Sequence, residues 1–284
     1  GDLRTAESCF TKSIELLQEA KEWSELGSTF LETALLYLRK GDLATMKKLL
    51  DKGLDLCQET GDERNVAIGY YHNAGLHEME NNWGKAIESC EKSLGIFKDI
   101  GDMLWIAIIH AELAFIKTFL RRFEEALEHF DMSIKTFEKT GLYAKLVEAC
   151  SDRALLCVEL GDLESAYKDC EKAIKFEEQL GNYYYYGVTY RALGMVAAAK
   201  KDWTKAEEYF KRSIELLSPA HQFHLAKTYF EIASVYEQKR DRASATEYLN
   251  RAAEIFKRLG SREEAENVWK KIEEMMSSDW ARIS

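Results

Sequence analysis

The sequence contains one proline in 284 residues, so almost nothing in it interrupts a helix. It has no excess of cations, since 39 Lys and Arg stand against 49 Asp and Glu, and this argues against nucleic acid as the main partner. No uncharged apolar run reaches membrane length, because the richest stretch, 183–199, contains Arg191. No signal peptide is recognisable. These absences predict a helical, soluble chain that binds neither nucleic acid nor a membrane.

Cysteine pairs of the Cys-x-x-Cys type are also missing, and in a chain this large the scattered cysteines need not form a disulfide framework. The six cysteines are Cys9, Cys57, Cys90, Cys150, Cys157 and Cys170. Cys90 and Cys170 occupy positions that hold Phe or Leu elsewhere in the sequence, so we interpret them as small core residues rather than reactive thiolates. Unpaired thiols in a chain of this size favour a reducing compartment, and we therefore expect a cytoplasmic protein.

The strongest feature that is present is an internal repeat of 40 residues, with one step of 39 near Pro219. Similar segments begin at residues 1, 41, 81, 121, 161, 201 and 240. Their sixth residue is alanine in nearly every copy, namely Ala6, Ala86, Ala126, Ala166, Ala206 and Ala245, with Met46 as the exception. Apolar or small residues recur at spacings of three and four, which predicts one buried face of a helix. We call these helices second-type helices.

A second helical pattern lies between these segments and defines the first-type helices. Each has a small residue in mid-helix with larger residues on both sides, as in Phe30-Ala34-Tyr37 and Tyr70-Ala74-His77. Small residues let two helices approach closely. Gly-Asp pairs at 41 and 161 offer a C-terminal glycine followed by an N-capping aspartate. The sequence therefore predicts alternating antiparallel helices and no sheet.

This alternation resembles the tetratricopeptide repeat, over residues 1–276. The departure is length, since about 34 residues are usual for that repeat. The resemblance implies an all-α fold, a right-handed superhelical α-solenoid of helix hairpins whose first-type helices line a concave groove. It also implies a non-catalytic scaffold or adaptor that binds proteins. Repeats of 40 residues are similar to those of certain cell-polarity adaptors and of bacterial regulators that sense peptides.

The two ends of the array are predicted to differ. We expect residues 261–276 to form a capping helix with Trp269 and Ile272 inward, because Glu273 stands where a small contact residue belongs, and 277–284 to be a C-terminal tail. The chain opens directly with a second-type helix. We therefore expect it to start within a repeat and the native protein to be longer at its N-terminus.

No motif for catalysis, a metal or a cofactor is found. A P-loop pattern is missing, and His72 and His77 are five residues apart, so they do not share the face that an HExxH site uses. We expect no catalytic residues, no metal and no cofactor. An enzymatic role survives only if catalytic residues precede this sequence.

The residues of the first-type helices that fall off the core face are unusually apolar for a solvated groove. A contiguous exposed apolar patch of this kind tends to mark a binding surface. The predicted groove consists of Leu31, Leu35, Leu38, Arg64, Ile68, Tyr71, Leu104, Ile108, Phe115, Glu148, Leu155, Tyr184, Val188, Arg191, Met195, Phe223, Lys227 and Phe230. The alternative is that tightly coiled repeats bury part of this row on neighbouring first-type helices.

We expect the partner to be a protein or peptide, either an amphipathic helix or an extended apolar segment, with Arg64, Glu148, Arg191 and Lys227 setting its register. Other interpretations are a structural module that self-associates and a regulatory or sensor part of a longer signalling protein. The lysines and asparagines of the chaperone-tail clamp have no counterpart at the matching positions, so Hsp-type tails are not expected as ligands.

Overall fold

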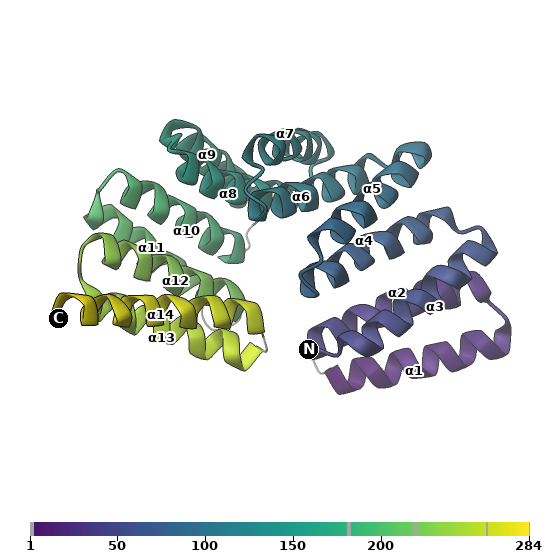
Figure 1. Ribbon diagram of the computed structural model, residues 1–284. Coiled ribbons are helices and arrows are strands. Elements are labelled where there is room, and N and C mark those ends of the chain that lie inside the picture. Colours follow the sequence, from purple (N-terminus) through teal and green to yellow (C-terminus); the bar gives the residue numbers. More distant parts are fainter. Residues whose placement is uncertain (1–2, 181–182, 218–220, 260, 284) are drawn as a thin grey trace. The chain divides into compact units, whose positions relative to one another are not determined.

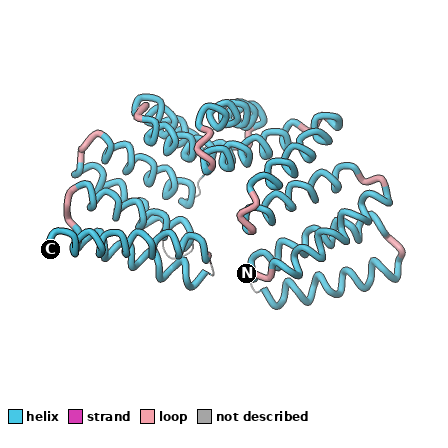
Figure 2. The backbone as a smooth tube through the Cα atoms, in the orientation of Figure 1, coloured by secondary structure: helices cyan, strands magenta, loops and turns pink. Residues whose placement is uncertain are grey.

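A computed structural model describes residues 3–180, 183–217, 221–259 and 261–283 (Figure 1). Within these ranges, the side chains of 39, 177–180, 183–185, 262–263 and 276–283 are outside the description. The described residues form fourteen α-helices and no strand (Figure 2), which confirms the all-α prediction. None of these helices combines the length and apolar character needed to cross a bilayer.

The chain divides into two units, Gly1–Thr140 and Gly141–Ser284. Unit 1 contains α1 (Leu3–Ala20), α2 (Trp23–Lys40), α3 (Leu43–Thr60), α4 (Glu63–Met79), α5 (Trp83–Ile100), α6 (Met103–Phe119) and α7 (Phe123–Thr140). Unit 2 contains α8 (Tyr143–Leu160), α9 (Leu163–Leu180), α10 (Tyr183–Ala199), α11 (Trp203–Leu217), α12 (Gln222–Gln238), α13 (Arg242–Leu259) and α14 (Arg262–Ile283). The even-numbered helices are the first-type helices of the sequence, and the odd-numbered ones are the second-type.

The helices pair as hairpins in which a first-type helix packs mainly on the second-type helix that follows it. In unit 1 the pairs are α2 with α3, α4 with α5 and α6 with α7; in unit 2 they are α8 with α9, α10 with α11 and α12 with α13. Each hairpin also contacts the first-type helix of the next hairpin of its unit, as α3 contacts α4 and α11 contacts α12. Each unit is therefore a stack of helix hairpins.

Small residues bring the paired helices together, as the repeat pattern predicts. The recurring alanines Ala86, Ala126, Ala166, Ala206 and Ala245 are fully buried. A Cβ on Gly194 of α10 would lie 2.6 Å from Phe210 Cε1, a clash that only glycine avoids.

Two buried serines mark the same close approach. Ser93 of α5 donates a hydrogen bond to the carbonyl of Ala67, and Ser213 of α11 donates one to the carbonyl of Gly187, both at 2.7 Å. A serine hydroxyl reaches a helical carbonyl only where the two backbones lie close together. Both contacts satisfy the hydroxyl inside the core, so neither buried serine costs an unpaired polar group.

Apolar side chains from successive helices fill the core of each unit. In unit 1, one cluster joins α2, α3 and α4, and the next joins α4, α5 and α6, where the buried Phe97 stacks on Trp105 with ring centroids 5.1 Å apart. In unit 2, one cluster extends from Val188 of α10 to Ile272 of α14. Four of the six cysteines, Cys57, Cys90, Cys150 and Cys170, are fully buried and Cys157 nearly so, whereas Cys9 is exposed.

The turns have the predicted caps. The side chains of Asp42, Asp62, Asn82 and Asp102 each accept a hydrogen bond from the backbone N–H three residues later. Glycines with positive φ end several helices, among them Gly41 and Gly161. At the equivalent position of other repeats, non-glycine residues adopt the left-handed conformation: Asn81, Arg121, Lys201 and Arg240, with φ between 56° and 62°. This part of the pattern was not visible in the sequence.

The last helix differs from its prediction in two respects. α14 continues to Ile283, so a helix extends into the region assigned to a tail. Trp269 does not face inward, because 47% of it is exposed, whereas its neighbours Val268 and Ile272 are buried. The helix presents Val268 and Ile272, four residues apart, to α13, which rotates the tryptophan toward solvent.

Candidate functional site

In unit 1, the first-type helices α4 and α6 present large apolar side chains beside a pair of carboxyl groups. Leu104, Ile108, Glu112 and Phe115 follow one another along α6 at spacings of three and four, so they share one helix face. Phe115 is 43% exposed and Leu104 37%. Tyr71 of α4 donates its hydroxyl to Glu112 Oε2 at 3.0 Å, which places it beside this row. We call these five residues the α4–α6 surface.

Glu78 of α4 also lies against Glu112, and its protonation differs from that of an ordinary glutamate. Burial raises the pKa of Glu78 to about 9, with the charge of Glu112 as the second cause. Glu78 is therefore a neutral acid near pH 7, and the two carboxyl groups together carry one negative charge. The α4–α6 surface thus combines exposed apolar area with a localised negative charge.

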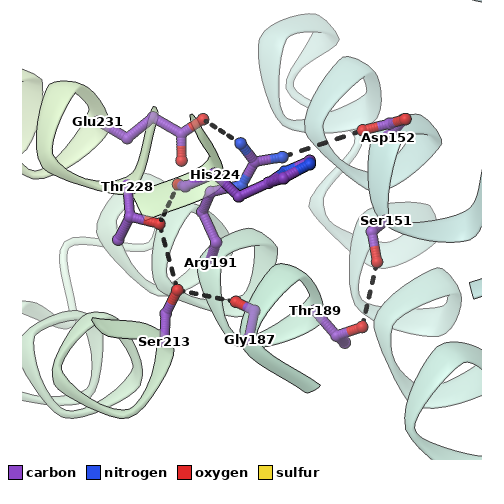
Figure 3. A network of polar contacts seen from close by, with 9 residues as sticks. All are labelled: Ser151, Asp152, Gly187, Thr189, Arg191, Ser213, His224, Thr228 and Glu231. Carbon is purple, nitrogen blue, oxygen red and sulfur yellow. Dashed lines mark hydrogen bonds and ion pairs between the residues drawn. The ribbon is translucent and has the colours of Figure 1, made fainter. Parts of the chain in front are cut away.

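In unit 2, charged side chains from three successive first-type helices meet (Figure 3). Arg191 of α10 is only 3% exposed, and its guanidinium lies between two carboxylates, with Nη2 3.9 Å from Asp152 Oδ1 of α8 and Nη1 3.8 Å from Glu231 Oε1 of α12. Lys227, one turn before Glu231 on α12, lies over the ring of Phe223 at 4.9 Å. We call Asp152, Arg191, Lys227 and Glu231 the Arg191 cluster.

Burial shifts the titration of the Arg191 cluster. It raises the pKa of Asp152 and of Glu231, an effect that the charges of Arg191 and Lys227 partly oppose. It lowers the pKa of Lys227, and the charge of Arg191 adds to that effect. About half of the Asp152 side chain (49%) stays exposed against 18% of Glu231, so solvent screens Asp152 more strongly and we expect the smaller shift there. The cluster is reachable from solvent on its Asp152 side.

A neutral polar network lies next to the Arg191 cluster. Ser213 Oγ, which holds the Gly187 carbonyl, is 3.2 Å from Thr228 Oγ1 on α12, and Thr228 donates to the carbonyl of His224 (Figure 3). Burial lowers the pKa of His224 to about 3, with the charge of Arg191 as the next cause, so its imidazole is neutral near pH 7. On the other side, Ser151 of α8 hydrogen-bonds Thr189 of α10 at 3.1 Å. These contacts fix α8, α10 and α12 around Arg191.

Comparison with protein families assigns this architecture. Residues 146–218 and residues 226–258 match models of the tetratricopeptide repeat. Both ranges lie in unit 2, which therefore contains tetratricopeptide repeats. The repeat recognised from spacing is thereby confirmed. A search of curated protein sequences gives no significant match.

Solved structures of other proteins have a similar fold over most of the chain. The apo form of RapI is 16% identical, with a TM-score of 0.77 over 92% of this chain and 94% of RapI. A Rap protein complexed with competence and sporulation factor is 17% identical, with a TM-score of 0.72 over 90% of this chain and 72% of that protein. BtubC (BKLC) from P. vanneervenii is 22% identical, with a TM-score of 0.66 over 76% of this chain and 91% of BtubC. At these identities the likeness concerns the fold.

The structure places the predicted groove residues in three environments. Leu31 and Val188 are part of the apolar cores and Arg191 is buried in its cluster, so none of the three offers an open surface. Leu104, Phe115 and Arg64 are exposed. The half-buried residues are Leu35, Leu38, Ile68, Tyr71, Ile108, Glu148, Leu155, Met195, Phe223, Lys227 and Phe230. Tyr184 is outside the described side chains. Part of the row is thus buried, Leu31 by α3 as well as α4.

Sequence reasoning missed the carboxylates that accompany the predicted cations. Asp152 lies four residues after Glu148 and Glu231 four residues after Lys227, so each shares a helix face with a residue that was selected. Extending those rows by one turn would have found both. Among the described residues of the chain, no group of three or more His, Cys, Asp or Glu is arranged to hold a metal ion.

Proposed function

We propose that the chain is a non-catalytic protein-interaction module that binds an amphipathic helix or an extended apolar segment on the α4–α6 surface. The observation that carries this proposal is the exposure of Phe115 and Leu104 on one face of a first-type helix. Removing such side chains from water stabilises a complex by about 1.5–3 kcal/mol each when burial is complete. Central aromatic residues commonly dominate the energy of an interface.

The charge of the α4–α6 surface favours a particular partner. Glu112 lies within the apolar row, one turn from both Ile108 and Phe115, and shares one negative charge with Glu78. A segment with a lysine or arginine between apolar residues complements this arrangement, since it places a cation beside the carboxyl pair and its apolar side chains on Phe115 and Leu104.

The test uses a fluorescein-labelled amphipathic peptide of leucine and lysine, and a scrambled isomer of the same composition, in fluorescence anisotropy with the full chain at physiological salt. We expect the amphipathic peptide to bind more tightly than the scrambled one. Phe115→Asp should weaken its binding roughly thirtyfold, the equivalent of about 2 kcal/mol. Phe115→Leu should keep most of the affinity.

The matched control is Glu128→Ala on α7, an exposed residue outside the α4–α6 surface. Equal binding of both peptides, or equal losses for Phe115→Asp and Glu128→Ala, would contradict the proposal. Circular dichroism of each variant checks that it is folded. A concentration series in light scattering detects self-association, and dimerisation that Phe115→Asp abolishes would assign the surface to a second copy of this chain.

A further inference from the structure

The Arg191 cluster has hydrogen-bonding capacity that its own side chains do not use. A guanidinium has five N–H donors. The two carboxylate oxygens that pair with Arg191 lie at 3.8 and 3.9 Å, which is outside hydrogen-bond range, and within the described part of the chain its Nε has no hydrogen-bond partner. Glu231 Oε2 is likewise buried with no donor among those residues. A buried cation and a buried carboxylate therefore retain one unused donor and one unused acceptor.

The charges of the cluster are already balanced. The cluster has two basic side chains, Arg191 and Lys227, and two acidic ones, Asp152 on α8 and Glu231 on α12, both of which pair with Arg191. An anionic ligand would be repelled by both carboxylates, and a cationic one by Arg191 and Lys227. Either would also leave a net charge in a largely buried site, which is costly. A neutral ligand with a donor and an acceptor close together avoids these costs.

We propose that the Arg191 cluster binds a carboxamide group, such as the side chain of an asparagine or glutamine. Its carbonyl oxygen accepts from Arg191, and its two amide N–H groups donate to Asp152 and Glu231, so that each polar group of the carboxamide faces a charge of the opposite sign. Entry is from the Asp152 side, where half of that side chain is exposed. The statement that a protein partner supplies the carboxamide rests on the proposed function. The ability of the cluster to bind a carboxamide does not depend on that function.

The experiment uses propionamide as the probe and nuclear magnetic resonance of the full chain with labelled arginine as the readout. Arg191→Lys identifies the Nε–Hε signal of Arg191. We expect this signal to shift saturably with propionamide, at millimolar concentrations because the probe is small. Propionate and 1-propanol, which have similar size and lack the amide, should give no saturable shift. The inference is overturned if propionamide produces none, or if either other compound matches it.

Variants of the carboxylates test the geometry. Glu231→Gln removes a charged acceptor and should weaken propionamide binding about tenfold, the loss of one hydrogen bond to a charged group. The matched control is Glu237→Gln on the same helix, whose carboxylate pairs with Lys271 outside the cluster, and it should bind as the unmodified chain does. Equal affinity in Glu231→Gln and Glu237→Gln would overturn the assignment. If Glu231→Gln does not fold, Asp152→Asn at the half-exposed position replaces it, with the same expected loss.

The two proposals can fail separately. Propionamide binding requires no macromolecular partner and involves only unit 2. Loss of peptide binding in Phe115→Asp concerns only unit 1.

Discussion

Acid should destabilise unit 1 through a buried histidine pair. His110 of α6 is 8% exposed, and its Nδ1 lies 2.8 Å from Nδ1 of His129 on α7. One imidazole must donate and the other accept in this contact, so both cannot be protonated there. Burial lowers the pKa of His110 from 6.5 to about 4, and the charge of His129 is the second cause.

The magnitude follows from linkage. The difference between 6.5 and about 4 corresponds to about 3 kcal/mol of unfolding free energy. The folded state holds His110 neutral, whereas the unfolded chain protonates it near pH 6.5. Above pH 6.5, His110 therefore does not change the free energy of unfolding. That free energy falls as the pH decreases from 6.5 to about 4, and His110 causes no further loss at lower pH.

The assay is urea unfolding of unmodified chain and His110→Asn, followed by circular dichroism between about pH 7 and pH 4. Asparagine cannot be protonated in this range, and its short amide can reach toward His129. We expect the variant to lose about 3 kcal/mol less than the unmodified chain over the same pH interval. Each protein at neutral pH serves as its own reference, which removes the direct cost of the substitution. The reasoning fails if the two proteins lose the same stability.

Two further substitution pairs test the turns and the faces of the helices. Lys201 has a φ of 59°, so Lys201→Gly should raise the free energy of unfolding by about 0.5–1 kcal/mol. Gly161 occupies the same turn position one repeat earlier, with a φ of 80°, and Gly161→Lys should lower the free energy of unfolding by about 1–2 kcal/mol. Thermal unfolding measures both, and changes of the same sign would contradict the backbone argument. Ala154→Trp, at a fully buried contact of α8, should cost at least about 1–3 kcal/mol, while Lys270→Ala on the exposed face of α14 should stay within about 0.5 kcal/mol. Similar losses at both positions, measured by urea unfolding, would show that these faces are wrongly assigned.

The hairpin pattern could be predicted from sequence because a buried helix contact repeats at fixed spacing. Ala86 and Ala206 occupy the same repeat position and are both fully buried. The capping role of Asp42 and Asp162 also followed from local sequence, because a cap involves only the next few residues. Trp269 was misplaced because spacing within one helix does not fix which of its faces meets α13, and the structure buries Val268 and Ile272 there instead.

The candidate sites depend on contacts between helices, which spacing on a single helix cannot show. Leu31 and Phe115 lie on comparable faces of their helices, yet one is buried and the other is 43% exposed, because only Leu31 is covered by α3 and α4. Arg191 was selected as a charge that sets register, but its partners Asp152 and Glu231 come from residues about 40 positions away on either side. Contacts between residues so far apart in the sequence can be identified only once the packing of the helices is known.

The two buried serines have a consequence for how such a chain can change length. Ser93 and Ser213 bond carbonyls that precede them by 26 residues in both cases, and the two sites are three repeat periods apart. Each contact joins the two helices of one hairpin, α4 with α5 and α10 with α11, so a hairpin that keeps this offset carries the contact within itself. Duplication or loss of one 40-residue period would leave that contact intact in every remaining hairpin. In evolution, the number of hairpins can thus vary more readily than the internal sequence of any one of them.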